Sequence, residues 1–319
     1  MNTLYLVIPC YNEEEVLPET AKRLKEKMTT LIESGKVSTK SRIVFVNDGS
    51  RDKTWQLIEE LHKENPLFSG VGLSRNKGHQ NALLAGLLTV KDSADFTISL
   101  DADLQDDLDA IDKMVDKYHE GCDVVYGVRS KRDTDTWFKR FTAEGYYKLI
   151  AAFGGEVVFN HADYRLLSQR ALNALAQYQE SALFLRGIVP MLGYKTDTVH
   201  YARGERFAGE TKYPFKKMLA LAIDGITSLS MRPVRLVTSA GFFLLAFTAI
   251  LGIVFLVQHF ICGPCTGAWR IPTLAIFFVG GLNLLGIGVV GEYAGRAYME
   301  AKRRPRFFVD KVLNAGEDK

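Results

Sequence analysis

The chain has 319 residues, of which 47% are hydrophobic and 24% are charged, and its formal net charge is +3. This length allows one or two domains, and so small a net charge gives no support for a nucleic-acid-binding protein. The apolar residues are concentrated near the C-terminal end, where residues 236–258 and 271–291 contain no charged side chain.

Short apolar runs alternate with segments of helical pattern along the first 130 residues. We expect strands at 4–9, 42–47, 68–73, 96–100 and 123–129, with a later one at 196–201, and helices at about 15–34, 54–64, 80–90 and 109–120. Strict alternation of this kind predicts an α/β fold with a mostly parallel sheet and helices on both faces.

Polar residues gather just after these strands, at 9–13, 48–52, 74–81 and 101–107. Because ligands of open α/β sheets bind at the carboxyl ends of strands, these groups should meet at one edge. The segment 101–107 holds four carboxylates, and oxygen ligands of this type suit Mg²⁺ or Mn²⁺. The alternative is a solvated acidic turn that caps the next helix. No Gly-x-Gly-x-x-Gly or Walker motif is present, which disfavours a dinucleotide dehydrogenase or a P-loop kinase.

The two uncharged runs are each long enough to cross a bilayer as a helix. Cations lie before the first run and after the second, whereas the connecting loop carries one arginine and no lysine, so the positive-inside rule places both termini in the cytoplasm. We therefore expect a cytosolic domain (1–212), an amphipathic juxtamembrane helix (213–232), two transmembrane helices (233–295) and a basic cytosolic tail (296–319).

Three smaller features of the sequence allow more than one interpretation. Residues 137–153 form either an amphipathic helix at the membrane surface or an ordinary surface helix. Cys262 and Cys265 form a local disulfide or are two loop thiols, in preference to a redox centre, while Cys10 and Cys122 are expected to be buried. We expect the glycines in the second span to allow close packing of the two helices of the hairpin, in preference to contacts in a homo-oligomer.

Several motifs together resemble a known family. Val7–Glu13, Val46–Asp52 and Asp101–Gln105 are similar to the nucleotide-sugar signature of family 2 glycosyltransferases, which have the GT-A fold. Arg75–Gln80, Asp163–Arg165, Arg206 to Tyr213 and the two-span tail narrow the resemblance to polyprenyl-phosphate glycosyltransferases, namely dolichyl-phosphate mannose synthases and bactoprenol glucosyltransferases. The resemblance covers nearly the whole chain and does not specify the sugar.

The resemblance implies a role for each matching position. The nucleoside-diphosphate sugar would be held by Pro9, Tyr11, Glu13, Asp48, Lys77 and Asp101. Asp103 and Gln105 would ligate Mg²⁺ or Mn²⁺. The lipid phosphate and the donor diphosphate would be met by Arg129, Arg165, Ser168, Arg206 and Lys212. Asp163 would orient Arg165 or contact sugar hydroxyls, in preference to acting as a base.

The implied reaction is inverting transfer of one sugar, from UDP-glucose or a UDP-N-acetylhexosamine, to undecaprenyl phosphate at the cytosolic face of a bacterial plasma membrane. The acceptor is already an anion, so the site needs no strong base and instead must hold two polyanions together. One alternative is a family 2 transferase acting on a neutral lipid hydroxyl. The other is a membrane scaffold that binds nucleotide sugars without catalysis.

Overall fold

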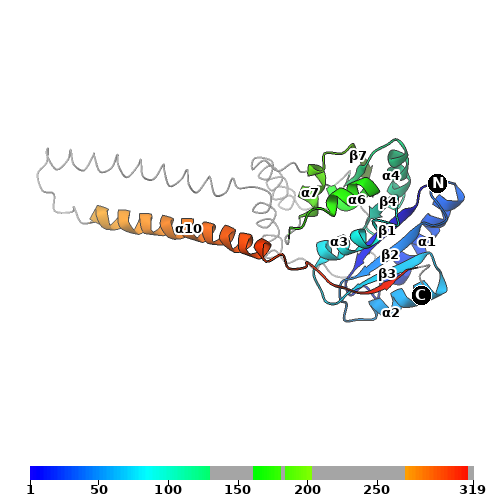
Figure 1. Ribbon diagram of the computed structural model, residues 1–319, viewed down its shortest axis with the longest axis horizontal. Coiled ribbons are helices and arrows are strands. Elements are labelled where there is room, and N and C mark those ends of the chain that lie inside the picture. Colours follow the sequence, from blue (N-terminus) through cyan, green and yellow to red (C-terminus); the bar gives the residue numbers. More distant parts are fainter. Residues whose placement is uncertain (130–160, 181–183, 203–269, 315–319) are drawn as a thin grey trace, which may run out of the picture. The chain divides into compact units, whose positions relative to one another are not determined.

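The computed structural model describes residues 1–129, 161–180, 184–202 and 270–314 (Figure 1). The chain divides into two compact units. The first comprises residues 1–222 together with 305–319, and the second comprises residues 223–304.

The first unit is built on one eight-stranded sheet. Its strands are β1 (Leu4–Cys10), β2 (Arg42–Asn47), β3 (Phe68–Leu73), β4 (Phe96–Ser99), β5 (Val124–Arg129), β6 (His161–Ser168), β7 (Thr196–Tyr201) and β8 (Val309–Leu313). Their order across the sheet is β7-β5-β6-β4-β1-β2-β3-β8. The neighbouring strands β4, β1, β2 and β3 are parallel to one another. Strand β6 is antiparallel to both of its neighbours, β4 and β5, and β8 is antiparallel to β3. The expected mostly parallel α/β sheet is confirmed.

Helices cover both faces of this sheet because side chains alternate along each buried strand. Leu6 and Ile8 of β1 join a core with α1 (Leu17–Glu33), α2 (Thr54–Glu64) and α4 (Ala110–His119). Val7 points to the opposite core, which contains α3 (His79–Val90), α6 (Gln169–Leu175) and α7 (Leu185–Met191). The strands and helices predicted from the first 129 residues all form, with ends that differ by at most about two residues.

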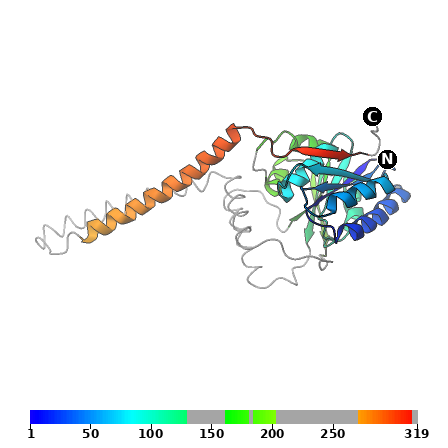
Figure 2. The ribbon, with the colours of Figure 1, turned by 90° about the horizontal axis from the view of Figure 1, so that it is seen from below.

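The C-terminal segment adds a strand that the sequence pattern did not predict. Within the expected basic tail, β8 pairs antiparallel with β3, with Val71 opposite Val312, and lies along the sheet edge (Figures 1 and 2). Phe307, just before β8, packs against the core on the α3 face. The last part of the chain therefore returns to the unit in which the chain begins.

In the second unit the structure describes α10 (Arg270–Ala301), a helix of 32 residues that includes the second predicted span. A search of the described residues finds no helix that qualifies as a candidate membrane span. Several predictions lie outside the described residues: the first span, the juxtamembrane helix, the segment 137–153, the cationic stretch 203–213 and the Cys262–Cys265 pair.

Candidate functional site

The loops after β1 and β2 are fastened to each other at the carboxyl end of the sheet. The backbone N–H of Asn12 donates to Ser50 Oγ (3.0 Å), and the Asn12 side-chain oxygen accepts from the N–H of Arg51 (2.9 Å). The N–H of Glu13 donates to Thr54 Oγ1 (2.9 Å). Asn12 adopts a left-handed backbone conformation (φ 53°), which asparagine tolerates better than most residues. These contacts give the two loops one fixed shape.

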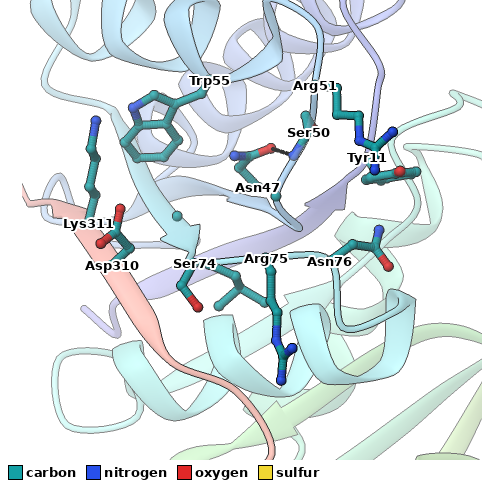
Figure 3. Close-up of a pocket in the computed structure, with 13 residues that line it drawn as sticks. Tyr11, Asn47, Ser50, Arg51, Trp55, Ser74, Arg75, Asn76, Asp310 and Lys311 are labelled. Carbon is teal, nitrogen blue, oxygen red and sulfur yellow. Dashed lines mark hydrogen bonds between the residues drawn. The ribbon is translucent and has the colours of Figure 1, made fainter.

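A pocket of about 440 Å³ opens beside these loops. Tyr11 stands at one end, Trp55 and Lys311 stand at the other, and Asn47 and Ser50 lie between them (Figure 3). The Ser50 N–H donates to the Asn47 side-chain oxygen over 3.1 Å. An aromatic ring, amide groups and flanking cations are the groups that recognise a base and its attached phosphates.

Asp48 is buried, with 2% exposure, and fixes the loop that follows β3. Its two oxygens accept the backbone N–H groups of Lys77 (2.7 Å) and Gly78 (2.8 Å). Burial raises the pKa of Asp48, although these two donors and His79 act in the opposite direction. Gly49 has φ +61°, and a Cβ there would come within 2.6 Å of the backbone carbonyl carbon of Arg75. Asp48 therefore shapes the pocket wall through the backbone of the next loop.

Two tyrosines hydrogen-bond to the acidic segment that follows β4. Asp106 is buried and accepts a hydrogen bond from the Tyr201 hydroxyl (2.7 Å), which in turn accepts from Arg129 Nε (3.3 Å). The Tyr164 hydroxyl donates to the carbonyl of Asp107 (3.0 Å). Burial, helped by the charge of Asp101, raises the pKa of Asp106 to about 6. Asp106 is thus a supporting group, while Asp101 and Asp103 remain partly exposed above it.

Asp103 and Gln105 lie on either side of Leu104, whose backbone is left-handed (φ 56°). This turn brings the Gln105 N–H to Asp103 Oδ1 (3.2 Å). No group of three or more His, Cys, Asp or Glu side chains in the described ranges is arranged to hold a metal. One carboxylate and one amide oxygen nevertheless suit Mg²⁺ or Mn²⁺, which usually complete their shells with substrate phosphates and water. The residues therefore fit a metal that binds together with a diphosphate.

Beside the acidic segment lies a buried ionic cluster centred on Asp163 of β6. Its Oδ1 accepts from Arg165 Nη2 (2.5 Å) and Arg186 Nε (3.2 Å), and its Oδ2 accepts from Arg186 Nη2 (3.0 Å). Arg165 also donates to the carbonyl of Leu185 (3.2 Å). Burial opposes ionisation of Asp163, but the two guanidinium groups outweigh it and hold its pKa well below the usual range. Asp163 is therefore suited to orient arginines and poorly suited to act as a base.

His79, at the start of α3, joins this cluster to the acidic segment. Its Nε2 lies 3.5 Å from Asp101 Oδ1 and 3.7 Å from Asp163 Oδ2. Neither the role of His79 nor that of Arg186 was predicted from the sequence. His79 stands inside the motif Arg75–Gln80, and Arg186 is followed by a glycine, but neither position has a spacing that links it to Asp163.

The structure brings only some of the predicted site residues together. Tyr11 lines the pocket, Pro9 lies within β1, Glu13 lies in the loop that follows β1, and Lys77 is positioned through its backbone. Arg129 lies beside the acidic segment, 3.9 Å from Asp106.

Arg165 and Ser168 are placed differently from the expectation that they meet phosphates. Arg165 is buried, with 2% exposure. Ser168 pairs with Phe96 at the far end of β4, where its hydroxyl caps α6 and donates to Asp123 (2.7 Å). The strand register thus separates Ser168 from the acidic segment. Arg206 and Lys212 lie outside the described residues.

Comparison with known proteins places this geometry in a family. Residues 5–176 match the domain described as glycosyl transferase family 2. An uncharacterized glycosyltransferase of Bacillus subtilis, YkoT, is 50% identical over 96% of this chain and 91% of its own length. The prophage bactoprenol glucosyl transferase homolog of Escherichia coli is 38% identical (96% and 98%), and the SfII prophage-derived bactoprenol glucosyl transferase of Shigella flexneri is 37% identical (96% and 97%).

Among solved structures, the glucosyl-3-phosphoglycerate synthase of Mycobacterium tuberculosis, in complex with Mn²⁺, UDP and phosphoglyceric acid, matches with a TM-score of 0.48 and 18% identity. The match covers 72% of this chain and 77% of that chain.

Proposed function

The chain belongs to glycosyl transferase family 2 and is a glycosyltransferase, and we propose that it transfers a single sugar from a nucleoside-diphosphate sugar to a polyprenyl phosphate. UDP-glucose or a UDP-N-acetylhexosamine is the donor and undecaprenyl phosphate is the acceptor. The acceptor class follows the bactoprenol glucosyl transferases, which this chain resembles along nearly its full length.

The main observation behind the proposal is that two kinds of subsite lie at one edge of the sheet, one suited to a nucleoside diphosphate and one suited to a second phosphate. The pocket and the acidic segment follow strands β1 to β4, and His79 lies between the acidic segment and the arginine cluster on Asp163. Asp103 and Gln105 would hold the divalent ion, which neutralises the leaving diphosphate when bound. The cations beyond it suit a second phosphate, since guanidinium groups bind phosphates through paired donors.

Inverting transfer to a phosphate needs no general base from the protein. A phosphate monoester is ionised near neutral pH, so the acceptor oxygen attacks the anomeric carbon without first losing a proton to a side chain. The carbon–oxygen bond to the nucleoside diphosphate breaks as the new bond forms, and the diphosphate leaves with the electron pair. The low pKa of Asp163 is consistent with a reaction that needs no base at this position.

We further propose that the enzyme is a multi-pass protein of a bacterial plasma membrane, with its catalytic domain and both termini in the cytoplasm. This rests on the two uncharged runs, on the cations that flank them and on the chemistry of the acceptor, whose polyprenyl chain stays in the bilayer. Anchoring the site at headgroup level would bring the acceptor phosphate within its reach.

The test of the reaction uses the full-length protein purified in detergent. Radiolabelled UDP-, GDP- and TDP-sugars are offered with undecaprenyl phosphate, undecaprenol or diacylglycerol, each with Mn²⁺, with Mg²⁺ or with EDTA. We expect organic-phase label from one UDP-sugar, only with the phosphorylated lipid and only with a divalent ion. Label on undecaprenol or diacylglycerol would favour a neutral hydroxyl acceptor, and donor binding with no product would favour a scaffold.

The membrane proposal is tested by labelling intact cells with a membrane-impermeant maleimide. Cys262 and Cys265 in the loop between the spans should react, after mild reduction if they form a disulfide. Cys10 and Cys122 are buried, with 2% and 4% exposure, and serve as internal controls that should stay unlabelled in the folded protein. Labelling only after the cells are permeabilised would refute the proposed orientation.

A further inference from the structure

The end of the chain is docked onto the first unit through a series of contacts. Arg306 donates a hydrogen bond to the carbonyl of Tyr178, and Phe307 packs against the core on the α3 face. Beyond them β8 pairs with β3, and Leu313 packs against the core on the face that α1 and α2 cover. Residues 305–314, the C-terminal segment, therefore contact the cores on both faces of the sheet.

The C-terminal segment also holds the start of the loop that follows β3. The N–H of Ser74, the first residue of this loop, donates to the carbonyl of Phe308 over 3.1 Å. At the other end of the loop, residues 74–78, Asp48 accepts two backbone N–H groups. Residues 73–76 line the pocket. The shape of this wall of the pocket thus depends on Phe308 as well as on Asp48.

Two side chains of β8 line the pocket themselves. Asp310 and Lys311 lie at the end where Trp55 stands (Figure 3). Lys311 Nζ lies 3.8 Å from Glu59 Oε1, which accepts from Trp55 Nε1 over 2.6 Å, and it lies 5.7 Å from the centre of the Trp55 ring. Gly72 of β3 leaves room for the indole, since a Cβ there would come within 3.2 Å of it. Strand β8 therefore forms part of the pocket wall at Trp55.

We propose that the C-terminal segment is a positioning element of the donor site, and that tight nucleotide binding requires this segment to be docked on β3. Phe308 fixes the loop after β3, and Lys311 completes the pocket at Trp55. Without β8, β3 would be an edge strand with unpaired backbone groups, and the loop that leaves it would lose its hold at Ser74. The donor site is then built from both ends of the chain, with the second predicted span between them in sequence. This deepens the proposed function and rests on it, because it concerns the pocket assigned to the nucleotide.

The experiment measures nucleotide binding to the full-length protein in detergent, with UDP and Mn²⁺ as the probe. Phe307→Ala removes the side chain that docks the segment on the core. We expect it to raise the dissociation constant of UDP about tenfold, because the apparent constant rises as the fraction of molecules with a docked segment falls. Lys311→Ala should raise this constant roughly three- to tenfold, as expected for the loss of one side chain from a binding pocket. In turnover assays the KM for the UDP-sugar should rise in both variants, while the KM for undecaprenyl phosphate stays near that of the wild type.

Each variant has a matched control. Leu88→Ala removes a partly buried apolar side chain that packs against the same core as Phe307, but it does so from α3 and leaves the C-terminal segment unchanged. The Tm of Leu88→Ala should fall by a similar amount, and its UDP binding should stay within about twofold of the wild type, because the effects of distant sites are independent. Lys63→Ala removes an exposed lysine of α2 that does not line the pocket, so its UDP binding should not change.

Hydrogen exchange measured by mass spectrometry gives a readout that does not depend on turnover. In the wild type, UDP with Mn²⁺ should slow exchange both in residues 74–78 and in β8, because a ligand that binds the docked state stabilises it against local opening. Without ligand, both segments should exchange faster in Phe307→Ala than in Leu88→Ala.

Three results would overturn the inference. Unchanged UDP binding in both Phe307→Ala and Lys311→Ala would show that the pocket does not need the C-terminal segment. An equal loss of UDP binding in Leu88→Ala would show that the loss follows general destabilisation. UDP that slows exchange in residues 74–78 but not in β8 would separate the segment from the donor site. If UDP protects both segments yet no polyprenyl phosphate is glycosylated, the proposed reaction fails while the role of the C-terminal segment stands.

Discussion

Replacing Arg165 with methionine separates a structural role from a ligand-binding role. Methionine fills a similar volume, so the change removes the charge without leaving a large cavity. Asp163 would keep Arg186 at 3.0 Å but lose its 2.5 Å partner, and the Leu185 carbonyl would lose its donor. Removing one partner of a buried ion pair costs about 3–5 kcal/mol, and we expect about 3 kcal/mol because Arg186 remains.

The assay is thermal denaturation of the purified protein in detergent, followed by intrinsic fluorescence. For a domain of about 200 residues, a loss of about 3 kcal/mol corresponds to a fall in Tm of roughly 6–12 °C. At a temperature where the variant is folded, its KM for the acceptor should rise by less than about threefold, because Arg165 does not reach the surface of the site.

Arg170→Met is the control for the loss of an arginine that pairs with an aspartate. Its partner Asp123 is 3.6 Å away, its guanidinium lies over the Tyr194 ring, and the Arg170 side chain itself is 69% exposed. Such contacts contribute about 1 kcal/mol or less, so the Tm should change little. A variant Arg165→Met with wild-type Tm and strongly impaired acceptor binding would refute the structural role and restore Arg165 as a phosphate ligand.

Three further predictions concern the acidic segment and the pocket. The pKa of Asp106 is raised to about 6, so its stabilising contribution is complete below about pH 4 and is lost as pH rises through about 6. Asp106→Asn still accepts the hydrogen bond from Tyr201 but cannot titrate. With EDTA present to remove metal ions, it should therefore remove up to about 3 kcal/mol of the pH dependence of the free energy of unfolding. A variant whose Tm changes between pH 5 and 8 in the same way as that of the wild type would contradict this. Gly49→Ala should weaken UDP binding at least about tenfold because the added Cβ meets backbone at 2.6 Å and φ is +61°; wild-type UDP affinity would show that the 75–78 loop does not shape the pocket. Asp103→Ala should abolish transfer and Mn²⁺-dependent UDP binding with little change in Tm, and normal turnover by the folded variant would refute the metal assignment.

The sequence alone was informative where local pattern and chemistry coincide. The strands at 42–47 and 68–73 and the helix at 54–64 form with the predicted bounds because apolar runs and helical spacing are local properties. The acidic segment after β4 and the polar loop after β1 were also predicted from local sequence, because the loops that follow parallel strands lie at one edge of the sheet.

Other parts depend on contacts between residues that are distant in the chain. β8 forms because β3 leaves an unpaired edge, and five exposed or partly exposed residues, Val309–Leu313, carry no strong pattern of their own. The family resemblance implied a phosphate-binding role for Ser168, yet the strand register places Ser168 opposite Phe96, at the end of β4 that lies away from the acidic segment.

The sequence thus determined the fold class, the family signature and the carboxylates of the acidic segment, because each is written in neighbouring residues. Only the tertiary structure distinguished the two arginines that pair with Asp163. Arg165 and Arg186 are alike as residues, and burial between β6 and α7 makes the first a counter-ion while leaving the second partly exposed. That distinction rests on solvent access and on a shared carboxylate, which are properties of the packed molecule and not of either residue.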